Sequence, residues 1–220
     1  MQVSIQPVQP RVPPERRPRI YLLSPAHTGG KRAGYLMREQ AEFELAVRLR
    51  REGIPIGEAF AFLSGLYFRG KLAYVQAFSA PPAGVPGSFV ITSGRGLVTP
   101  ETLVTLDCLR ELAGVPIDPA DIRYREPLER TVTELFAAAG PDCDYVLLGS
   151  VATTKYLEPI SAILGDRLLF PQEFAGRGDM SRGGLMLRCA AAGEPLTYAP
   201  VGNLTRHGPR PPKLIPRRWK

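Results

Sequence analysis

The stretch Arg19-Ile20-Tyr21-Leu22-Leu23-Ser24 sets four consecutive large apolar residues between an arginine and a turn-like segment, and this run decides the fold class. A contiguous apolar run of this length is typical of a strand that is buried on both faces, as strands are in a parallel sheet. Residues 25–30 then provide a turn. The sequence therefore predicts that residues 19–24 form the first core strand of an α/β protein.

Further strands and helices alternate along the rest of the chain. Strands are predicted at 88–92, 145–149, 167–170 and 196–201. The predicted helices are one that carries Leu36, Phe43 and Leu49 and ends at Gly53, a helical region over 57–78 that Gly65 and Gly70 can divide, short pieces within 94–122, and helices over 124–140, 151–164 (interrupted at Pro159) and 180–192. This alternation predicts one α/β domain with a mainly parallel sheet covered by helices on both faces.

Charge is distributed very unevenly over the 220 residues. The net charge is +7, yet residues 1–19 carry +3 and residues 206–220 carry +6, which leaves −2 for residues 20–205. We therefore expect a basic, proline-rich arm over 1–19, an α/β domain over 20–205 and a basic tail over 206–220. The two ends suit non-specific attraction to phosphate, or they are simply solvated ends that keep the protein in solution.

No apolar stretch approaches the roughly 18 residues that span a bilayer, and the first residues do not resemble a secretory signal. The sequence therefore predicts a cytoplasmic protein without a membrane partner. Three widely separated cysteines, Cys108, Cys143 and Cys189, have no histidine at metal-ligand spacing. We expect reduced, mostly buried thiols, no metal site and no cofactor.

Three glycine-containing segments follow predicted strands, and ligands of open α/β sheets bind at such strand ends. The first segment, residues 24–32, offers Ser24, His27, Thr28, Lys31 and Arg32 around a glycine pair. Backbone amides at a helix start, with two cations beside them, suit a phosphate or carboxylate. His27 is a candidate acid or base, although a structural hydrogen bond or an ordinary charged turn explains these residues as well.

The second segment, residues 93–97, contains Ser93 and Arg95, and its glycines would let a ligand approach the backbone closely. The third segment, residues 176–184, precedes a helix that Asp179 or Ser181 is placed to cap. A simple turn accounts for the glycines equally well. The candidate ligand-binding residues of these two segments are Ser93, Arg95, Arg177, Ser181 and Arg182, with Asp179 as a further candidate acid or base.

Aromatic residues are concentrated between residues 60 and 78 at helical spacing. Such a pattern is more typical of a buried helix face than of a platform on which nucleic-acid bases stack.

The three strand-end segments, in this order, resemble the YaaA peroxide-stress protein family. The matching stretches are Leu22-Leu23-Ser24-Pro25-Ala26-His27-Thr28, Ser93-Gly94-Arg95-Gly96-Leu97-Val98-Thr99-Pro100, residues 149–159 and Arg177-Gly178-Asp179-Met180-Ser181-Arg182. The resemblance implies a fold related to uracil-DNA glycosylase, DNA binding and a role in limiting oxidative damage. The family more often has a lysine at the position of His27 and an aromatic residue at that of Arg95.

The leading hypothesis is a nucleic-acid-binding protein, for DNA foremost, with an anion or base pocket at the sheet end. One alternative is an N-glycosidase or base-transferring enzyme acting on a nucleotide or nucleic acid, with His27 and Asp179 as its catalytic residues. A second alternative is a nucleotide sensor without chemistry. All three hypotheses place the ligand at the same strand ends.

Overall fold

The structure is a computed structural model that describes residues 17–150, 154–203, 211, 212 and 214. Its strands are β1 (Arg19–Leu23), β2 (Ile54–Pro55), β3 (Ser88–Ile91), β4 (Leu97–Val98), β5 (Leu103–Val104), β6 (Asp144–Leu148), β7 (Leu168–Pro171) and β8 (Tyr198–Pro200). Its α-helices are α1 (Lys31–Leu36), α2 (Glu44–Arg51), α3 (Ile56–Ser64), α4 (Leu66–Phe78), α5 (Leu106–Gly114), α6 (Ile122–Ala139), α7 (Thr154–Leu164) and α8 (Asp179–Ala192).

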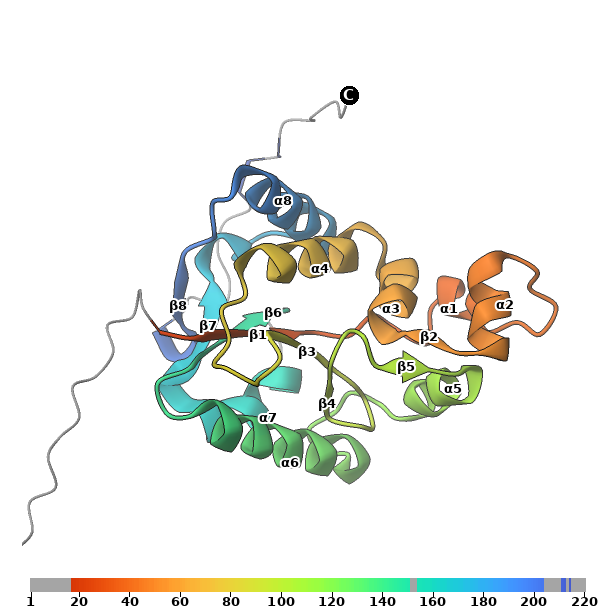
Figure 1. Ribbon diagram of the computed structural model, residues 1–220, viewed down its shortest axis with the longest axis horizontal. Coiled ribbons are helices and arrows are strands. Elements are labelled where there is room, and N and C mark those ends of the chain that lie inside the picture. The colour runs from red at the N-terminus through yellow and green to blue at the C-terminus, as the bar shows by residue number, and fades with distance from the viewer. Residues whose placement is uncertain (1–16, 151–153, 204–210, 213, 215–220) are drawn as a thin grey trace, which may run out of the picture.

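The main sheet has six strands in the order β4-β3-β1-β6-β7-β8. The four inner strands are parallel, and the edge strands β4 and β8 are antiparallel to their neighbours. Helices α4 and α8 cover one face and α6 and α7 cover the other (Figure 1). The predicted α/β fold with a mainly parallel sheet is therefore confirmed.

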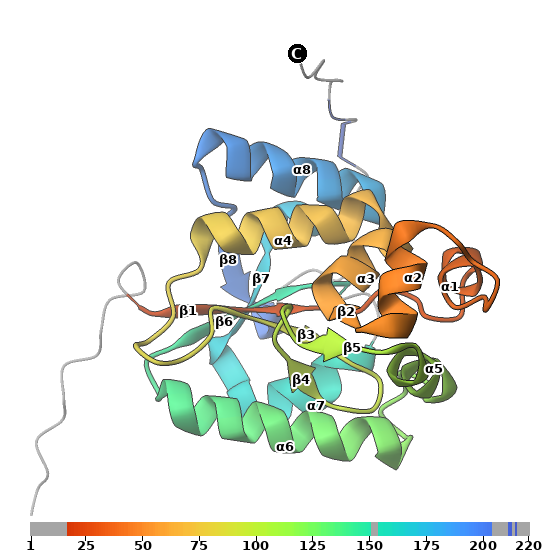
Figure 2. The same cartoon turned by 45° about the vertical axis from the view of Figure 1, so that its right-hand side comes forward.

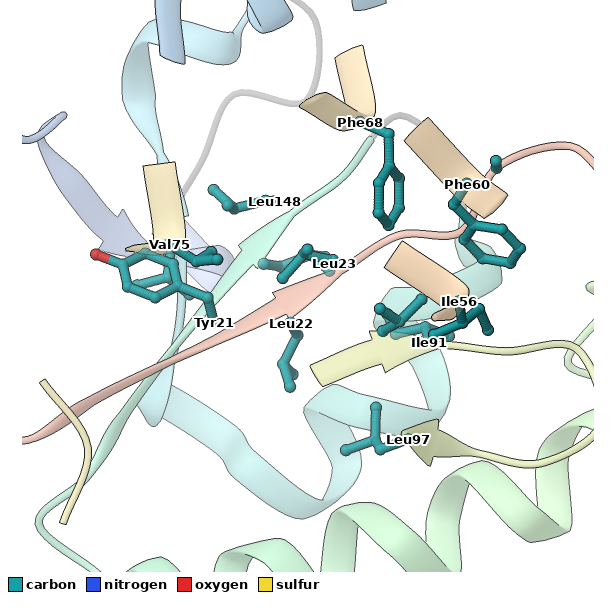
Figure 3. Packing of buried hydrophobic residues seen from close by; sticks show 14 of the residues in the cluster. Tyr21, Leu22, Leu23, Ile56, Phe60, Phe68, Val75, Ile91, Leu97 and Leu148 are labelled. Atoms are coloured by element: carbon teal, nitrogen blue, oxygen red, sulfur yellow. The ribbon is translucent and has the colours of Figure 1, made fainter. Parts of the chain in front are cut away.

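Strand β1 lies at the centre of this sheet, with β3 on one side and β6 on the other. Its four residues from Ile20 to Leu23 are completely buried. Tyr21 and Leu23 point toward α4, whereas Leu22 points to the opposite face, toward Leu97 (Figure 3). Each such aliphatic side chain stabilises the fold by about 1.5–3 kcal/mol on burial, so this run anchors the core on both faces of the sheet.

The predicted helix that ends at Gly53 is two helices, α1 and α2, separated by residues 37–43. The expectation of one helix was wrong because tertiary contacts hold this segment in a loop. The Arg50 guanidinium donates hydrogen bonds to the carbonyls of Arg38 and Ala41, and the Phe43 ring stacks on Phe62 at 5.4 Å between centroids. Gly53, with a φ of 79°, follows the end of α2 as predicted.

Gly65 separates α3 from α4 with a φ of 59°, as the sequence predicted, but Gly70 lies inside α4 without interrupting it. A Cβ atom at Gly70 would come within 2.6 Å of the Gly183 carbonyl oxygen, and one at Gly183 would come equally close to the Leu66 carbonyl oxygen. Helices α4 and α8 therefore cross with their backbones in close approach, side by side over the sheet (Figure 2). This contact fixes the position of α8 against α4, the helix that packs over β1.

Pro159, expected to interrupt a helix, lies within α7. A proline removes the backbone donor that would bond the carbonyl four residues earlier, here that of Lys155. The hydroxyl of Tyr124 in α6 donates to that carbonyl at 2.9 Å, which replaces the missing bond.

Residues 94–122, predicted to contain short helical pieces, contain one such piece, α5, together with the small strands β4 and β5, which were not predicted. The small strands form because β4 pairs with β3, and β5 pairs with β2 in a separate two-stranded sheet. Each of these strands has only two residues, which is too short to leave a periodic signal in the sequence. None of the helices in the described ranges is long and apolar enough to cross a membrane.

Candidate functional site

A hollow of about 240 Å³ lies where β1 and β6 end, beneath the first turns of α4 and α8. Strand β1 runs toward the side of the sheet where α1, α2 and α3 lie (Figure 1). Segments from five parts of the chain form the wall of the hollow. The wall consists of Ser24, Pro25, Ala26, His27, Leu63, Ser64, Tyr67, Ser150, Tyr156 and Asp179. The hollow thus has the location that a parallel sheet favours for a ligand.

Ser24 follows the last residue of β1 and remains bound to the sheet, because its backbone N–H donates to the Leu148 carbonyl at 3.2 Å. Gly149 follows β6 beside it, and a Cβ at Gly149 would come within 2.9 Å of the Ser24 side chain. The glycine therefore leaves the space that the Ser24 hydroxymethyl group occupies. This close approach brings the two strand ends together at the floor of the hollow.

Lys71 of α4 is completely buried and binds Ser24 twice. Its Nζ atom lies 2.7 Å from the Ser24 carbonyl oxygen and 2.8 Å from Ser24 Oγ. The Nζ atom also lies 4.0 Å from the centroid of the Tyr67 ring and 5.2 Å from that of Phe68. Within the described ranges, no carboxylate lies within ion-pair distance of Lys71.

Burial lowers the pKa of Lys71 to about 7, because the ammonium form loses its hydration without gaining a paired carboxylate. Asp179 opposes this effect and Arg182 adds to it, both from α8. The side chain therefore exchanges between ammonium and neutral amine near neutral pH. A lysine that titrates in this range inside a fold is a recognised mark of a functional site.

The Tyr67 hydroxyl is buried and has no hydrogen-bond partner among the described residues, although the residue lines the hollow. A buried hydroxyl without a hydrogen bond destabilises the folded state, which indicates that a ligand or a water molecule bonds to it. Burial is the largest cause that raises the pKa of Tyr67 to about 12. The hydroxyl therefore stays protonated and remains a hydrogen-bond donor.

The first predicted segment reaches the hollow only in part. Ser24 and exposed His27 line it, and Gly29 and Gly30 leave room for the imidazole, since a Cβ at either would lie within 3.4 Å of the ring. Thr28, Lys31 and Arg32 lie outside the wall, and Arg32 donates to the Phe62 carbonyl at 3.4 Å.

The second predicted segment binds other parts of the fold. Ser93 is buried and donates to the Leu112 carbonyl at 2.5 Å, and Arg95 pairs with Glu111 of α5 at 2.6 Å. Gly96 has a φ of 65°, and a Cβ there would overlap the Pro127 carbonyl oxygen. The structure thus does not bring Ser93 and Arg95 to the hollow, and the glycine serves a tight turn against α6.

The third predicted segment borders both the hollow and a second, larger groove of about 610 Å³. Asp179, the first residue of α8, lines both cavities. Contrary to prediction, neither Asp179 nor Ser181 caps α8, whose N-cap is Gly178 without a side-chain bond, because the helix begins one residue earlier than expected. The groove is lined by Leu66, Gly176, Arg177, Gly178, Asp179, Met180, Ser181, Gly184, Arg188, Pro211, Pro212 and Leu214.

The arginines of this segment differ in how they are held. Arg177 donates to the Glu173 carbonyl at 2.9 Å and to Ser181 Oγ at 3.1 Å, which fixes its guanidinium along the groove. Arg182 is buried, donates to the Phe174 carbonyl at 3.2 Å and lies 3.6 Å from Asp179. Arg177 therefore lines the groove, and Arg182 forms an ion pair with Asp179.

Five polar residues of the wall or floor were not predicted from the sequence: Ser64, Tyr67, Lys71, Ser150 and Tyr156. For Lys71 a signal existed, because residues 67, 68, 71, 74 and 75 form one helical stripe, and Lys71 is the one charge in it. A charged residue within an apolar stripe means either that the charge is buried or that the stripe does not face the core. In this structure the stripe faces the core, and Lys71 is buried.

No cluster of three or more His, Cys, Asp or Glu side chains suited to a metal ion occurs in the described part of the chain. All three cysteines are free thiols, with Cys108 and Cys143 buried and Cys189 half-buried.

No family model matches this chain, and neither a curated protein nor a solved structure matches it. The resemblance to the YaaA family therefore stays a prediction from the motifs, and function is argued from the site itself.

Proposed function

We propose that the protein binds nucleic acid, DNA foremost, or a nucleotide, with one base in the hollow and the adjoining phosphates in the groove beside α8. The observation that carries this proposal is that Asp179 lines both cavities, so a single ligand can occupy the two at once. A role in protection from DNA damage or oxidative stress is what the resemblance to the YaaA family would add.

The hollow suits a planar heterocycle of the size of one base. About 240 Å³ is below the 300–1,000 Å³ of pockets that take drug-sized ligands, so only a small part of a ligand fits. Tyr67 and Tyr156 supply aromatic surface, and burial raises the pKa of Tyr156 to about 12, so both remain neutral phenols. The Tyr67 hydroxyl can donate a hydrogen bond and the Asp179 carboxylate can accept one. Together they match the acceptors and donors on the edge of a base.

The groove supplies the complementary charge for phosphates. Arg177, which precedes α8, and Arg188, in the third turn of α8, both line the groove. The groove also borders the first turn of α8, where the helix dipole favours an anion. Arg177 presents a guanidinium that Glu173 and Ser181 already orient, so little side-chain entropy is lost when it binds a phosphate.

A direct test is fluorescence anisotropy of a labelled 12-nucleotide single strand and its duplex at low salt. We expect Arg177→Ala combined with Arg188→Ala to weaken binding by about tenfold or more, since removing each charge-assisted hydrogen bond costs about 1 kcal/mol or more. Arg123→Ala on α6 is the matched control, because Arg123 is exposed and pairs with Asp121 on the opposite face of the sheet. Equal weakening in the control, or unchanged binding in the groove variant, would contradict the proposal.

A further inference from the structure

Two serines follow neighbouring parallel strands, and their hydroxyls have different partners. Ser93, after β3, donates to the backbone carbonyl of Leu112 away from the hollow, as structural serines commonly do. Ser24, after β1, lines the hollow and has the Lys71 amine 2.8 Å from its Oγ. Of these two serines, Ser24 alone combines access to a ligand with a basic partner.

The Lys71 amine is held within hydrogen-bond distance of the Ser24 hydroxyl. As an ammonium group, Lys71 donates to the Ser24 carbonyl at 2.7 Å and to Ser24 Oγ at 2.8 Å. Once Lys71 loses a proton, an N–H can keep the bond to the carbonyl while the nitrogen lone pair accepts the Ser24 O–H. The charged groups that face Lys71 are Asp179 and Arg182 of α8, and the neutral phenol of Tyr67 lies on its own helix. The lowered pKa of Lys71, about 7, makes the neutral amine available under ordinary conditions.

Tyr67 is the third residue of this group, beside Ser24 and Lys71. Tyr67 lines the same hollow, and its buried hydroxyl makes no hydrogen bond to another described residue, so donation to a ligand oxygen would break no existing bond. Such a preorganised donor is what stabilises an oxyanion in acyl transfer.

We propose that Ser24 is a nucleophile with Lys71 as its general base and Tyr67 as oxyanion donor, and that the protein hydrolyses small carboxylic esters in the hollow. Serine–lysine pairs are a known variant of the serine–histidine arrangement. This activity goes beyond nucleic-acid binding and does not depend on it.

The chemistry balances with water as the only co-reactant. Ser24 Oγ bonds to the carbonyl carbon while its proton passes to Lys71 Nζ, and the Tyr67 hydroxyl donates to the oxyanion. The bond from carbon to the alkoxy oxygen then breaks, and Lys71 returns the proton to the leaving alcohol. Water attacks the acyl-serine, Lys71 accepts a water proton, and the proton returns to Ser24 Oγ as the carboxylic acid leaves.

The hollow restricts the acyl group to a small one. Pro25, Ala26 and Leu63 provide an apolar wall opposite the polar floor, within about 240 Å³. Acetyl or butyryl esters fit this space, whereas long-chain acyl groups do not.

The test uses the full chain with a fluorophosphonate probe and with p-nitrophenyl acetate, in the absence of nucleic acid. We expect the probe to modify Ser24, identified by peptide mass mapping, with a rate that rises through pH 7 as Lys71 loses its proton. Tyr67→Phe should slow ester hydrolysis by about 100-fold, the typical effect of removing one oxyanion donor, while the thermal midpoint stays the same or rises.

Ser24→Ala should abolish both reactions yet still fold, because the Lys71 bond to the backbone carbonyl remains. Ser93→Ala, which removes the buried serine that follows β3, is the control that keeps full activity. Lys71→Met tests the base, with circular dichroism to establish that it folds. An unlabelled Ser24 at pH 8.5, or hydrolysis that survives in Ser24→Ala, would overturn the inference, and neither result would bear on the anisotropy experiment.

Discussion

At the residue scale, one buried lysine organises the candidate site. Lys71 has the aromatic rings of its own helix around it and the end of β1 beside it. Its two hydrogen bonds to Ser24 offset part of the cost of burying an ionisable group. That cost depends on protonation, so it leads to a pH prediction.

The lowered pKa of Lys71 makes stability depend on pH in a defined window. In the unfolded chain the amine titrates near its ordinary value of 10.5, whereas in the folded protein it titrates at about 7. Between these values the unfolded state binds more protons, so the free energy of unfolding increases as pH rises above 7. Below pH 7 both states are protonated, and this gain is absent.

We expect the unfolding free energy of the wild type, relative to Lys71→Met, to increase by about 1–2 kcal/mol between pH 7 and 8.5. Urea titrations at both pH values measure it, and the methionine variant cancels the contributions of all other groups. A flat or falling difference would mean that Lys71 titrates outside this window.

At the element scale, the crossing of α4 and α8 determines which side chains reach the hollow. Tyr67 and Lys71 come from α4 and Asp179 from α8, so their separation depends on how closely the two helices approach. Gly70 and Gly183 permit this approach because neither has a side chain at the crossing. Gly70, which the sequence predicted to be a weak point of a helix, is therefore a packing site.

Gly70→Ala or Gly183→Ala should destabilise the protein by about 1–3 kcal/mol or more, because the added methyl group would press on the backbone of the facing helix. Gly184→Ala is the matched control on the same helix. A Cβ at Gly184 meets only the Leu214 side chain at an ordinary 3.5 Å, so the better helix propensity of alanine should leave stability unchanged or raised.

Thermal unfolding by circular dichroism compares the three variants. If Gly183→Ala and Gly184→Ala unfold at the same temperature, the close approach of α4 and α8 does not contribute to the stability of the fold as described.

At the scale of the whole molecule, the basic charge lies at the chain ends, whereas residues 20–205 carry −2. The domain itself begins before Arg19, because Arg17 lies 3.5 Å from buried Asp144 and Arg19 is the first residue of β1. The expected basic arm, 1–19, therefore includes residues that belong to the fold. Most of the two predicted ends, 1–16 of the arm and 206–210, 213 and 215–220 of the tail, lie outside the described residues.

Removal of residues 1–16 together with 215–220 should weaken DNA binding and flatten its salt dependence, while the melting temperature of the protein is retained. The deletion removes a net charge of +4 without touching β1 or Leu214. The slope of log K against log salt should become shallower by roughly 1–3, in proportion to the number of phosphates that the two ends neutralise. An unchanged slope would show that the ends do not contact phosphate.

Much of the fold was predictable from local pattern. The contiguous apolar run of β1, the β-branched run of β3 and the amphipathic stripe of α6 depend on neighbouring residues alone, and all three occur where predicted. The loop between α1 and α2 was not predictable because bonds from Arg50 stabilise it, and β5 was not because its partner β2 is distant in sequence. Strand β4 was missed because its two residues are too few to show an alternating pattern.

For the site, the sequence by itself determined that polar residues follow buried parallel strands, and Ser24, His27 and Asp179 indeed line the hollow. It did not determine the partners of those residues. Ser24 and Ser93 have similar local contexts, yet one contacts a lysine 47 residues away and the other a backbone carbonyl. Only the packing of α4 across the end of β1 decides this, because hydrogen bonds and desolvation depend on neighbours in space.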